Sequence, residues 1–317
     1  MPIGDTNLDR AIYDLLSVQC PAMWLGWPIG TGNVFWVDSI RGDDGNVGTR
    51  PDLAFATIIF ALTQCADDNN DYIMVIEDWS EGATILVTSS RVHIIGLGNS
   101  QRPNSGQPFV ALTASADFPI FTINEPAGHV EISGFACGGG ATSAGIESVA
   151  SGVQGPHIHD CAFGHFFSGG TPRDGIFMGV GATNMRVENC YFYGTPTGKG
   201  LLTRDGFRYT SAPNPYNGVL INNKFLGLPG VGINITAAGG DGGFTIQDNT
   251  FECGGDVQGS AITLGVTVFG CLVVGNKAIY GNGAVAMVQN PYLDNTVAAP
   301  YNAWAANYKG NALINPA

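Results

Sequence analysis

The stretch Ile158-His159-Asp160-Cys161-Ala162-Phe163 is the first clear copy of a six-residue string that returns four more times. Each copy begins with an apolar residue, carries Asp, Asn or Gly third and Cys or Asn fourth, and ends in Phe or Ala. The later copies are VENCYF at 187–192, LINNKF at 220–225, IQDNTF at 246–251 and VVGNKA at 273–278. Their starts are 29, 33, 26 and 27 residues apart. A near-constant spacing of this length is typical of a repeat architecture.

A second string, a small residue followed by an apolar strand, recurs in phase with the first. Its strands contain Ile146, Ile176, Phe207, Ile233, Ile262 and Val285, and weaker copies of the first string begin at Ile132 and Ile94. We therefore expect two strands in each repeat. A β-sandwich gives no reason for one string to repeat in register, whereas the coils of a parallel β-helix stack equivalent positions about 4.8 Å apart. The sequence predicts an all-β fold of the parallel β-helix type.

Stacked coils should align identical side chains into ladders along the axis. The fourth position of the string predicts a Cys and Asn ladder, in which the Asn amides hydrogen-bond to one another: Cys161, Cys190, Asn223, Asn249 and Asn276. The sixth position predicts an aromatic ladder inside the coil: Phe163, Phe192, Phe225 and Phe251. We interpret both ladders as structural.

The region before the repeats carries a motif of its own. VDS at 37–39 leads into GDDGN at 42–46 and then into AFATI at 54–58, with AL at 61–62 and an IIG string from Ile94. With Pro51 near its start, this order predicts a strand, a Gly/Asp turn and a helix.

This motif resembles the pectate-lyase-like parallel β-helix superfamily over residues 34–290. The resemblance implies a right-handed, single-stranded β-helix whose short N-terminal helix caps the mouth of the coil and covers its open sheet edge. The superfamily includes polysaccharide lyases, glycoside hydrolases, phage tailspikes and capsid decoration proteins, so the motif does not select one activity.

The two ends of the chain differ from its centre. Residues 1–33 are expected to form an attachment segment, with a short amphipathic helix followed by two tryptophans that dock on another protein or fold back on the coil. Its attachment residues would be Leu8, Ile12, Leu15, Trp24 and Trp27. Residues 291–317, rich in Tyr and Asn, are expected to be a C-terminal cap or an oligomerisation tail.

The amino-acid composition limits the classes of partner that the protein is expected to bind. The 13 basic and 26 acidic residues give a net charge of −13, which opposes binding to nucleic acids and anionic membranes. The first 14 residues lack a basic and apolar leader, so we expect no secretory signal. Seven cysteines without a C-x-x-C pair indicate buried thiols rather than a disulfide scaffold.

Two Arg-Asp-Gly strings, at 173–175 and 204–206, are the main candidates for chemistry. Because they precede equivalent strands, Asp174 and Asp205 should stack on neighbouring coils, at a separation that suits a retaining glycosidase pair or a shared calcium site. Arg173 and Arg204 would then bind the ligand. The alternative is turn chemistry, in which Asp caps the backbone and Gly supplies an unusual φ. The double Asp and the Gly-His-Gly found in pectin-cleaving hydrolases of this fold are missing here.

Histidines 157 and 159 alternate along one expected strand and should therefore share a face. One interpretation is a metal site; the other, which is favoured, is that these histidines hydrogen-bond to turns. We expect no metal site and no cofactor.

These observations favour a virion structural protein, made in the host cytoplasm. It would be a phage capsid decoration protein or a tailspike-like spike protein that binds host surface polysaccharide. We expect it to assemble as a homotrimer and to dock on a capsid or tail protein. The alternative is a polysaccharide-degrading enzyme, a glycoside hydrolase or lyase of the tailspike-depolymerase kind, using Asp174 and Asp205. A cell-surface adhesin is a third hypothesis, which sequence does not separate from the first.

Overall fold

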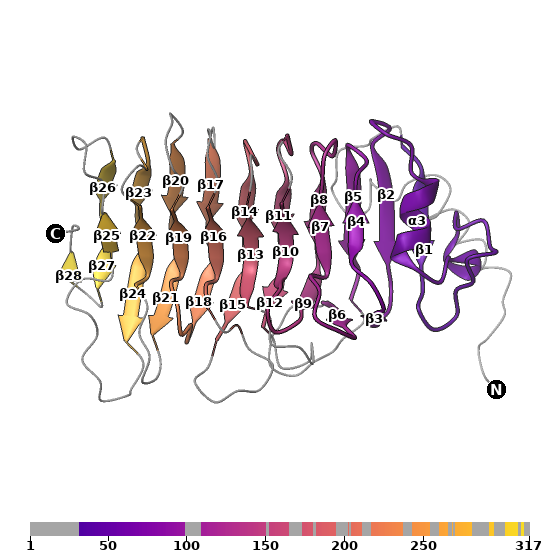
Figure 1. Cartoon of the computed structure of the whole chain (residues 1–317), viewed down its shortest axis with the longest axis horizontal. Coiled ribbons are helices and arrows are strands. Elements are labelled where there is room, and N and C mark those ends of the chain that lie inside the picture. The colour runs from indigo at the N-terminus through magenta and orange to yellow at the C-terminus, as the bar shows by residue number, and fades with distance from the viewer. Residues whose placement is uncertain are drawn as a thin grey trace, which may run out of the picture.

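The computed structural model of the chain is a parallel β-solenoid whose coils follow one another along its long axis (Figure 1). It describes residues 32–98, 109–149, 152–164, 173–179, 182–194, 202, 204–210, 217–236, 243–253, 260–265, 268, 270–280, 292–294, 302–309 and 312–313.

Three sheets, here called A, B and C, run along the solenoid. Among the described residues, sheet A contains β1 (Val34–Val37), β2 (Asp71–Val75), β5 (Val92–Gly96), β8 (Glu131–Ser133), β11 (His157–His159), β14 (Arg186–Glu188), β17 (Gly218–Ile221), β20 (Phe244–Gln247), β23 (Leu272–Val274) and β26 (Ala303–Ala305). Sheet B contains β3 (Trp79–Glu81), β6 (Val110–Ala114), β9 (Phe135–Gly138), β12 (Ala162–Phe163), β15 (Tyr191–Tyr193), β18 (Lys224–Leu226), β21 (Thr250–Cys253), β24 (Lys277–Tyr280), β27 (Tyr308–Lys309) and β28 (Ala312–Leu313). Sheet C contains β4 (Ile85–Val87), β7 (Phe121–Ile123), β10 (Ala144–Ser148), β13 (Asp174–Met178), β16 (Phe207–Tyr209), β19 (Ile233–Ile235), β22 (Ile262–Leu264) and β25 (Tyr292–Asp294).

Strand register confirms the predicted repeat. The first residues of the six-residue strings pair in one row from coil to coil: Ile94, Ile132, Ile158, Val187, Leu220, Ile246 and Val273. The expectation of two strands per repeat is wrong, because the string itself bends and supplies one strand to sheet A and the next to sheet B. Each complete coil therefore holds three strands.

The bend in the string explains its third position. That residue has a positive φ in one coil after another, from 50° at Asp160 to 76° at Gly134. Asn189, Asn222, Asp248 and Gly275 share this left-handed conformation. Asn, Asp and Gly tolerate it better than other residues, so the backbone turn selects the residue types that the string repeats.

The Asn ladder forms as predicted and satisfies its own polar groups. The Asn249 Oδ1 accepts the backbone N–H of Asn223 at 2.9 Å and its side-chain amide at 3.0 Å, while the Asn249 Nδ2 donates to Leu220 O at 2.9 Å. Asn276 and Asn307 repeat the pattern, and all of these side chains are buried. Each amide thus joins two coils without leaving a buried polar group unpaired.

The aromatic ladder is stacked beside it. Ring centroids are 5.0 Å apart for Phe163 and Phe192, and 4.6 Å apart for Phe192 and Phe225. Gly206 packs on the edge of this ladder, since a Cβ added there would lie 2.5 Å from Phe225 Cδ1, and Gly175 stands in the same relation to Phe192. Neither glycine has a positive φ, so the expectation of an unusual φ is wrong. Close approach of the ring, not backbone conformation, requires glycine there.

The expected capping helix is present as α3 (Ile58–Gln64), which lies at the N-terminal end of the solenoid beside β1 (Figure 1). Its buried Ile58 and Ala61 join the core of the coil. It begins later than the sequence motif suggests, because Pro51–Leu53 forms a separate 3₁₀ turn. Thr57 caps α3 by accepting from Phe60 N–H, and Asp44 of the GDDGN string in turn accepts from Thr57 N–H at 3.0 Å. The acidic loop therefore fixes the start of the helix.

The three sheets continue beyond residue 290, since β25, β26 and β27 each pair with the preceding coil. Tyr292, rather than the predicted Val285, occupies the row of Ile262, and Val285 lies outside the described residues. The division of the chain at residues 33 and 290 stays a prediction. No helix in the described part of the chain is long and apolar enough to cross a membrane.

Replacing Asn249 with Leu should destabilise the solenoid by about 3 kcal/mol or more, because the buried N–H of Asn223 and the carbonyl of Leu220 lose their partners. Urea unfolding followed by circular dichroism measures the loss. Glu252→Leu, at an exposed position of sheet B on the same coil, is the control and should change stability by less than about 0.5 kcal/mol. Equal effects of the two substitutions would contradict a stabilising role for the ladder.

Candidate functional site

The outward face of sheet C carries a row of polar and aromatic side chains. Outward and inward residues alternate along its strands, and the inward ones, such as Ile146 and Ile176, are fully buried. Register places the outward residues side by side on successive coils, and we call them the sheet C row: Thr122, Glu147, Phe177, Arg208, Asn234 and Thr263.

The centre of the sheet C row combines cations with an aromatic ring. The guanidinium carbon of Arg208 lies 5.7 Å from the Phe177 ring centroid, and that of Arg173 lies 5.9 Å from it. Arg208 Nε and Asn234 Oδ1 are buried, and within the described part of the chain no hydrogen-bond partner meets them. Unpaired buried polar atoms cost stability, and both atoms have almost no surface that a ligand could contact directly.

The predicted pair, Asp174 and Asp205, lies on neighbouring coils beside this row, as the repeat implies. Asp174 is fully buried. Its carboxylate accepts from Arg204 Nε at 2.8 Å, from Arg204 Nη2, from Arg173 Nε at 3.4 Å and from the backbone N–H of Asp205 at 3.2 Å. Arg204, which the sequence predicts to bind ligand, is therefore engaged in an ion pair with Asp174.

Asp205 repeats the role of Asp174 one coil further along. It is 3% exposed, accepts the backbone N–H of Val231 at 2.8 Å, and accepts the Asn234 side-chain amide at 3.0 Å. Both carboxylates therefore cap the backbone of the next coil. This geometry favours the turn-capping interpretation, and a catalytic role for the pair stays a prediction.

Glu147 is the carboxyl-bearing residue of the sheet C row, and its side chain is partly exposed. Burial raises the pKa of Glu147, and this effect outweighs the hydrogen bond from the Thr122 hydroxyl and the charge of Arg173, which lower it. Sequence reasoning missed Glu147, Phe177 and Arg208, although the alignment of Ile146, Ile176 and Phe207 would have placed them in one outward row.

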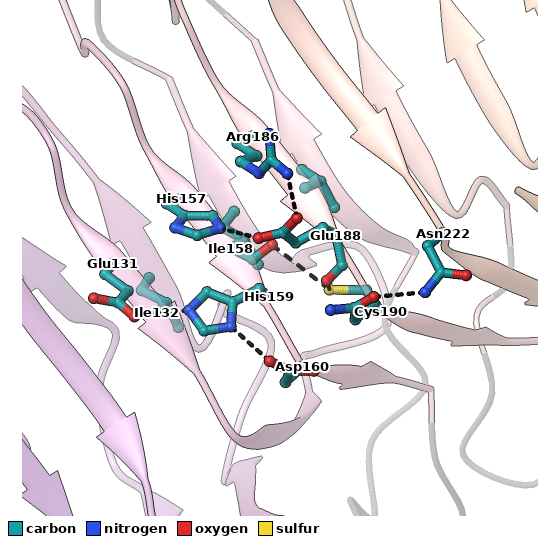
Figure 2. A network of polar contacts seen from close by, with 12 residues as sticks. Glu131, Ile132, His157, Ile158, His159, Asp160, Arg186, Glu188, Cys190 and Asn222 are labelled. Carbon is teal, nitrogen blue, oxygen red and sulfur yellow. Dashed lines mark hydrogen bonds and ion pairs between the residues drawn. The ribbon is translucent and has the colours of Figure 1, made fainter. Parts of the chain in front are cut away.

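A second set of polar side chains lies on the outward face of sheet A, and we call it the sheet A network (Figure 2). Its members are His93, Glu131, His157, His159, Asp160, Arg186 and Glu188. Glu131 pairs in register with both His93 and His157. The Glu131 Oε1 lies 2.7 Å from His159 Nε2, and its Oε2 lies 2.5 Å from His93 Nδ1. His157 contacts Glu188 rather than a turn, so the expectation for this histidine is wrong, while His159 does contact the turn residue Asp160.

Charges in the sheet A network support one another. Burial opposes a charge on His159, but hydrogen bonds to Asp160 and Glu131 outweigh burial and raise its pKa to about 10. Burial likewise opposes the charge on Glu131, yet the hydrogen bonds from His159 and His93 lower its pKa to about 2. For His157, burial and the charge of His159 lower the pKa. The network thus holds a positive charge between Glu131 and Asp160 at neutral pH.

The predicted attachment residues lie outside the described residues: Leu8, Ile12, Leu15, Trp24 and Trp27. The prediction of thiols fits the described cysteines Cys137, Cys161 and Cys190, which are buried and free.

No family model matches the chain, and no curated protein matches it by sequence. Solved structures align with much of the chain. The Dettilon tailspike protein gp208 is 14% identical, with a TM-score of 0.43 over 79% of this chain and 55% of its own. A rhamnogalacturonan lyase is 14% identical, with a TM-score of 0.41 over 78% of this chain and 74% of its own. ORF18 of Geobacillus virus E2 is 11% identical, with a TM-score of 0.34 over 80% of this chain and 57% of its own.

The chain thus spans about half the length of the tailspike chain. The strand pairing itself makes the chain a parallel β-solenoid, and this architecture is consistent with the pectate-lyase-like β-helix that the sequence resembles.

Replacing Asp174 with Ala should lower the free energy of unfolding by about 2 kcal/mol, chiefly because the buried N–H of Asp205 loses its acceptor. The lost ion pair adds little, since Arg204 is about one-third exposed and solvent screens its charge. Thermal and urea unfolding measure the change. Asp52→Ala, which removes an exposed ion pair with Arg50, is the matched control and should have almost no effect. An unchanged unfolding midpoint for Asp174→Ala would contradict the capping role.

Proposed function

We propose that the chain is a structural protein of a phage particle, a β-helical decoration or spike protein that binds host surface polysaccharide through the sheet C row. The observation that carries the proposal is the burial of Asp174 and Asp205 under hydrogen bonds from the next coil. Those carboxylates accept backbone hydrogen bonds and are not available to a ligand. The neighbouring side chains that could contact a ligand are Arg208, Phe177 and Asn234. Such a surface favours binding over cleavage.

Carbohydrate is the ligand class that suits this surface. An aromatic face packs on the C–H side of a sugar ring, while the guanidinium and amide groups hydrogen-bond to hydroxyls or to the carboxylates of acidic sugars. The row crosses several coils, so it matches an extended polymer better than a single small molecule.

A homotrimer is supported by the C-terminal part of sheet A. From β17 to β26 its outward positions are Val219, Ile221, Thr245, Gln247, Leu272, Val274, Ala303 and Ala305. None is charged, and the side chain of Leu272 is exposed. An uncharged and mostly apolar face of this kind is suited to packing against copies of itself. Residues 1–33 would remain available to attach the protein to a capsid or tail protein.

A polysaccharide-degrading enzyme is the second candidate, and Glu147 favours it. A carboxyl group with a raised pKa, next to Phe177 in the row that would bind the glycan, has the property of a general acid. In such an enzyme Glu147, rather than Asp174 and Asp205, would be the catalytic acid.

Light scattering on the full chain should give three times the mass of one chain, and a form without residues 1–33 should remain a trimer. Leu272→Glu should produce a monomer, because three buried carboxylates would meet at the interface. Leu86→Glu adds the same charge at an exposed position of sheet C and should leave the trimer intact. A monomeric full chain would contradict the trimer.

Binding to a panel of bacterial surface polysaccharides should weaken about tenfold or more in Arg208→Gln, because a charged hydrogen-bond donor is lost. Arg186→Gln makes the same exchange on sheet A and is the matched control. Biolayer interferometry measures binding, and the release of reducing ends measures cleavage. If the panel is cleaved, Glu147→Gln should abolish cleavage and retain binding. Equal affinities for the wild type and Arg208→Gln would exclude the sheet C row as the glycan site.

A further inference from the structure

The sheet A network brings three residues with good metal-binding atoms to one place. Glu131 comes from β8, whereas His157 and His159 come from β11 on the next coil (Figure 2). One ligand atom from each side chain lies within 4.8 Å of the others. The three side chains are partly exposed, at 21%, 34% and 17%, so an ion can reach them from solvent.

The orientation of His159 is that of a metal ligand. Its Nε2 faces Glu131, while its Nδ1 lies 2.7 Å from Asp160 Oδ2. Metal-binding histidines nearly always donate their second ring N–H to a carboxylate or carbonyl, which fixes the ring and makes the ligand nitrogen more basic. Asp160 directly follows His159 in the chain, at the bend between β11 and β12, where its φ is 50°.

The other two side chains are supported in the same manner. The Glu131 Oε2 is held by His93, whose Nε2 contacts Asn70 Oδ1 at 3.0 Å, so the Oε1 is left to face His159. The His157 Nε2 is held by Glu188 at 2.8 Å, which makes its Nδ1 the ligand nitrogen. Glu188 is fixed in turn by Arg186 at 2.6 Å. Each of the three ligands therefore has its own outer partner.

We propose that Glu131, His157 and His159 bind a Zn²⁺ ion on the outward face of sheet A. Two imidazole nitrogens and one carboxylate oxygen are a ligand set that suits Zn²⁺, whereas Ca²⁺ and Mg²⁺ prefer oxygen ligands alone. Zinc bond lengths of about 2.0–2.2 Å place tetrahedral ligand atoms about 3.3 Å apart. The ligand atoms lie within 4.8 Å of one another, so their side chains would shift on binding. Solvent or a partner molecule supplies the fourth ligand.

The ion would join two coils. Successive coils are otherwise linked by backbone hydrogen bonds and by the buried ladders, and a zinc bridge from β8 to β11 adds a linkage on the outer surface. Binding would therefore stabilise the folded solenoid without changing its architecture.

Isothermal titration of the full chain with ZnCl₂ should show one Zn²⁺ bound per chain. At about one hundred times the dissociation constant, the melting temperature should rise by roughly 5 °C. Substitution with Co²⁺ should give the visible bands of a tetrahedral nitrogen and oxygen site. CaCl₂ at the same concentration should produce neither change.

Variants locate the site. Glu131→Gln and His157→Gln should each weaken Zn²⁺ binding about 100-fold or more, and Asp160→Asn, which changes only the partner of His159, about tenfold. Glu252→Gln removes an exposed carboxylate on sheet B and is the matched control for Glu131→Gln. Circular dichroism without metal checks that each variant is folded.

Two results would overturn the proposal. One is the absence of stoichiometric Zn²⁺ binding and of tetrahedral Co²⁺ bands in the wild-type chain, a measurement that needs no variant. The other is binding that persists unchanged in the folded Glu131→Gln and His157→Gln variants, which would place the ion elsewhere.

Discussion

The amide of one buried asparagine bonded to the next is the interaction on which the solenoid depends. Asn223, Asn249, Asn276 and Asn307 each accept from the coil before and donate to a carbonyl of that coil. A slip of one residue in any coil would leave amides and backbone groups buried without partners. The ladder therefore fixes the register, and the register fixes which residues face outward in every sheet.

Much of this architecture was open to sequence reasoning because the same constraint acts in every coil. The repeat predicted the stacked rows, the Asn ladder and the Phe ladder. It did not predict three strands per coil, because the bend inside the string is a single left-handed residue and leaves the apolar pattern intact. The restriction of that position to Asp, Asn or Gly was visible, but it also fits an ordinary turn between strands.

The candidate sites were less accessible, for a different reason. Asp174 and Asp205 stood out because Asp-Gly strings are conspicuous, yet a buried carboxylate that caps the next coil and a partly exposed one look the same in sequence. Glu131 precedes a weak copy of the string, so nothing marks it until Ile132 is placed beside Ile158. Outward rows are spread over the chain at one residue per coil. Only the register assembles them.

The packing of glycine against phenylalanine also has a consequence for sequence variation. Ala261 occupies the row of Gly206 and Gly232, and Ala278 occupies the row of Phe225 and Phe251. Where the ring is replaced by a methyl group, the glycine has thus become alanine, within the same chain. The two rows share one fixed volume per coil, so substitutions in them are expected to covary among homologues although the residues lie about twenty positions apart. Such pairs offer a way to align coils whose other residues have diverged.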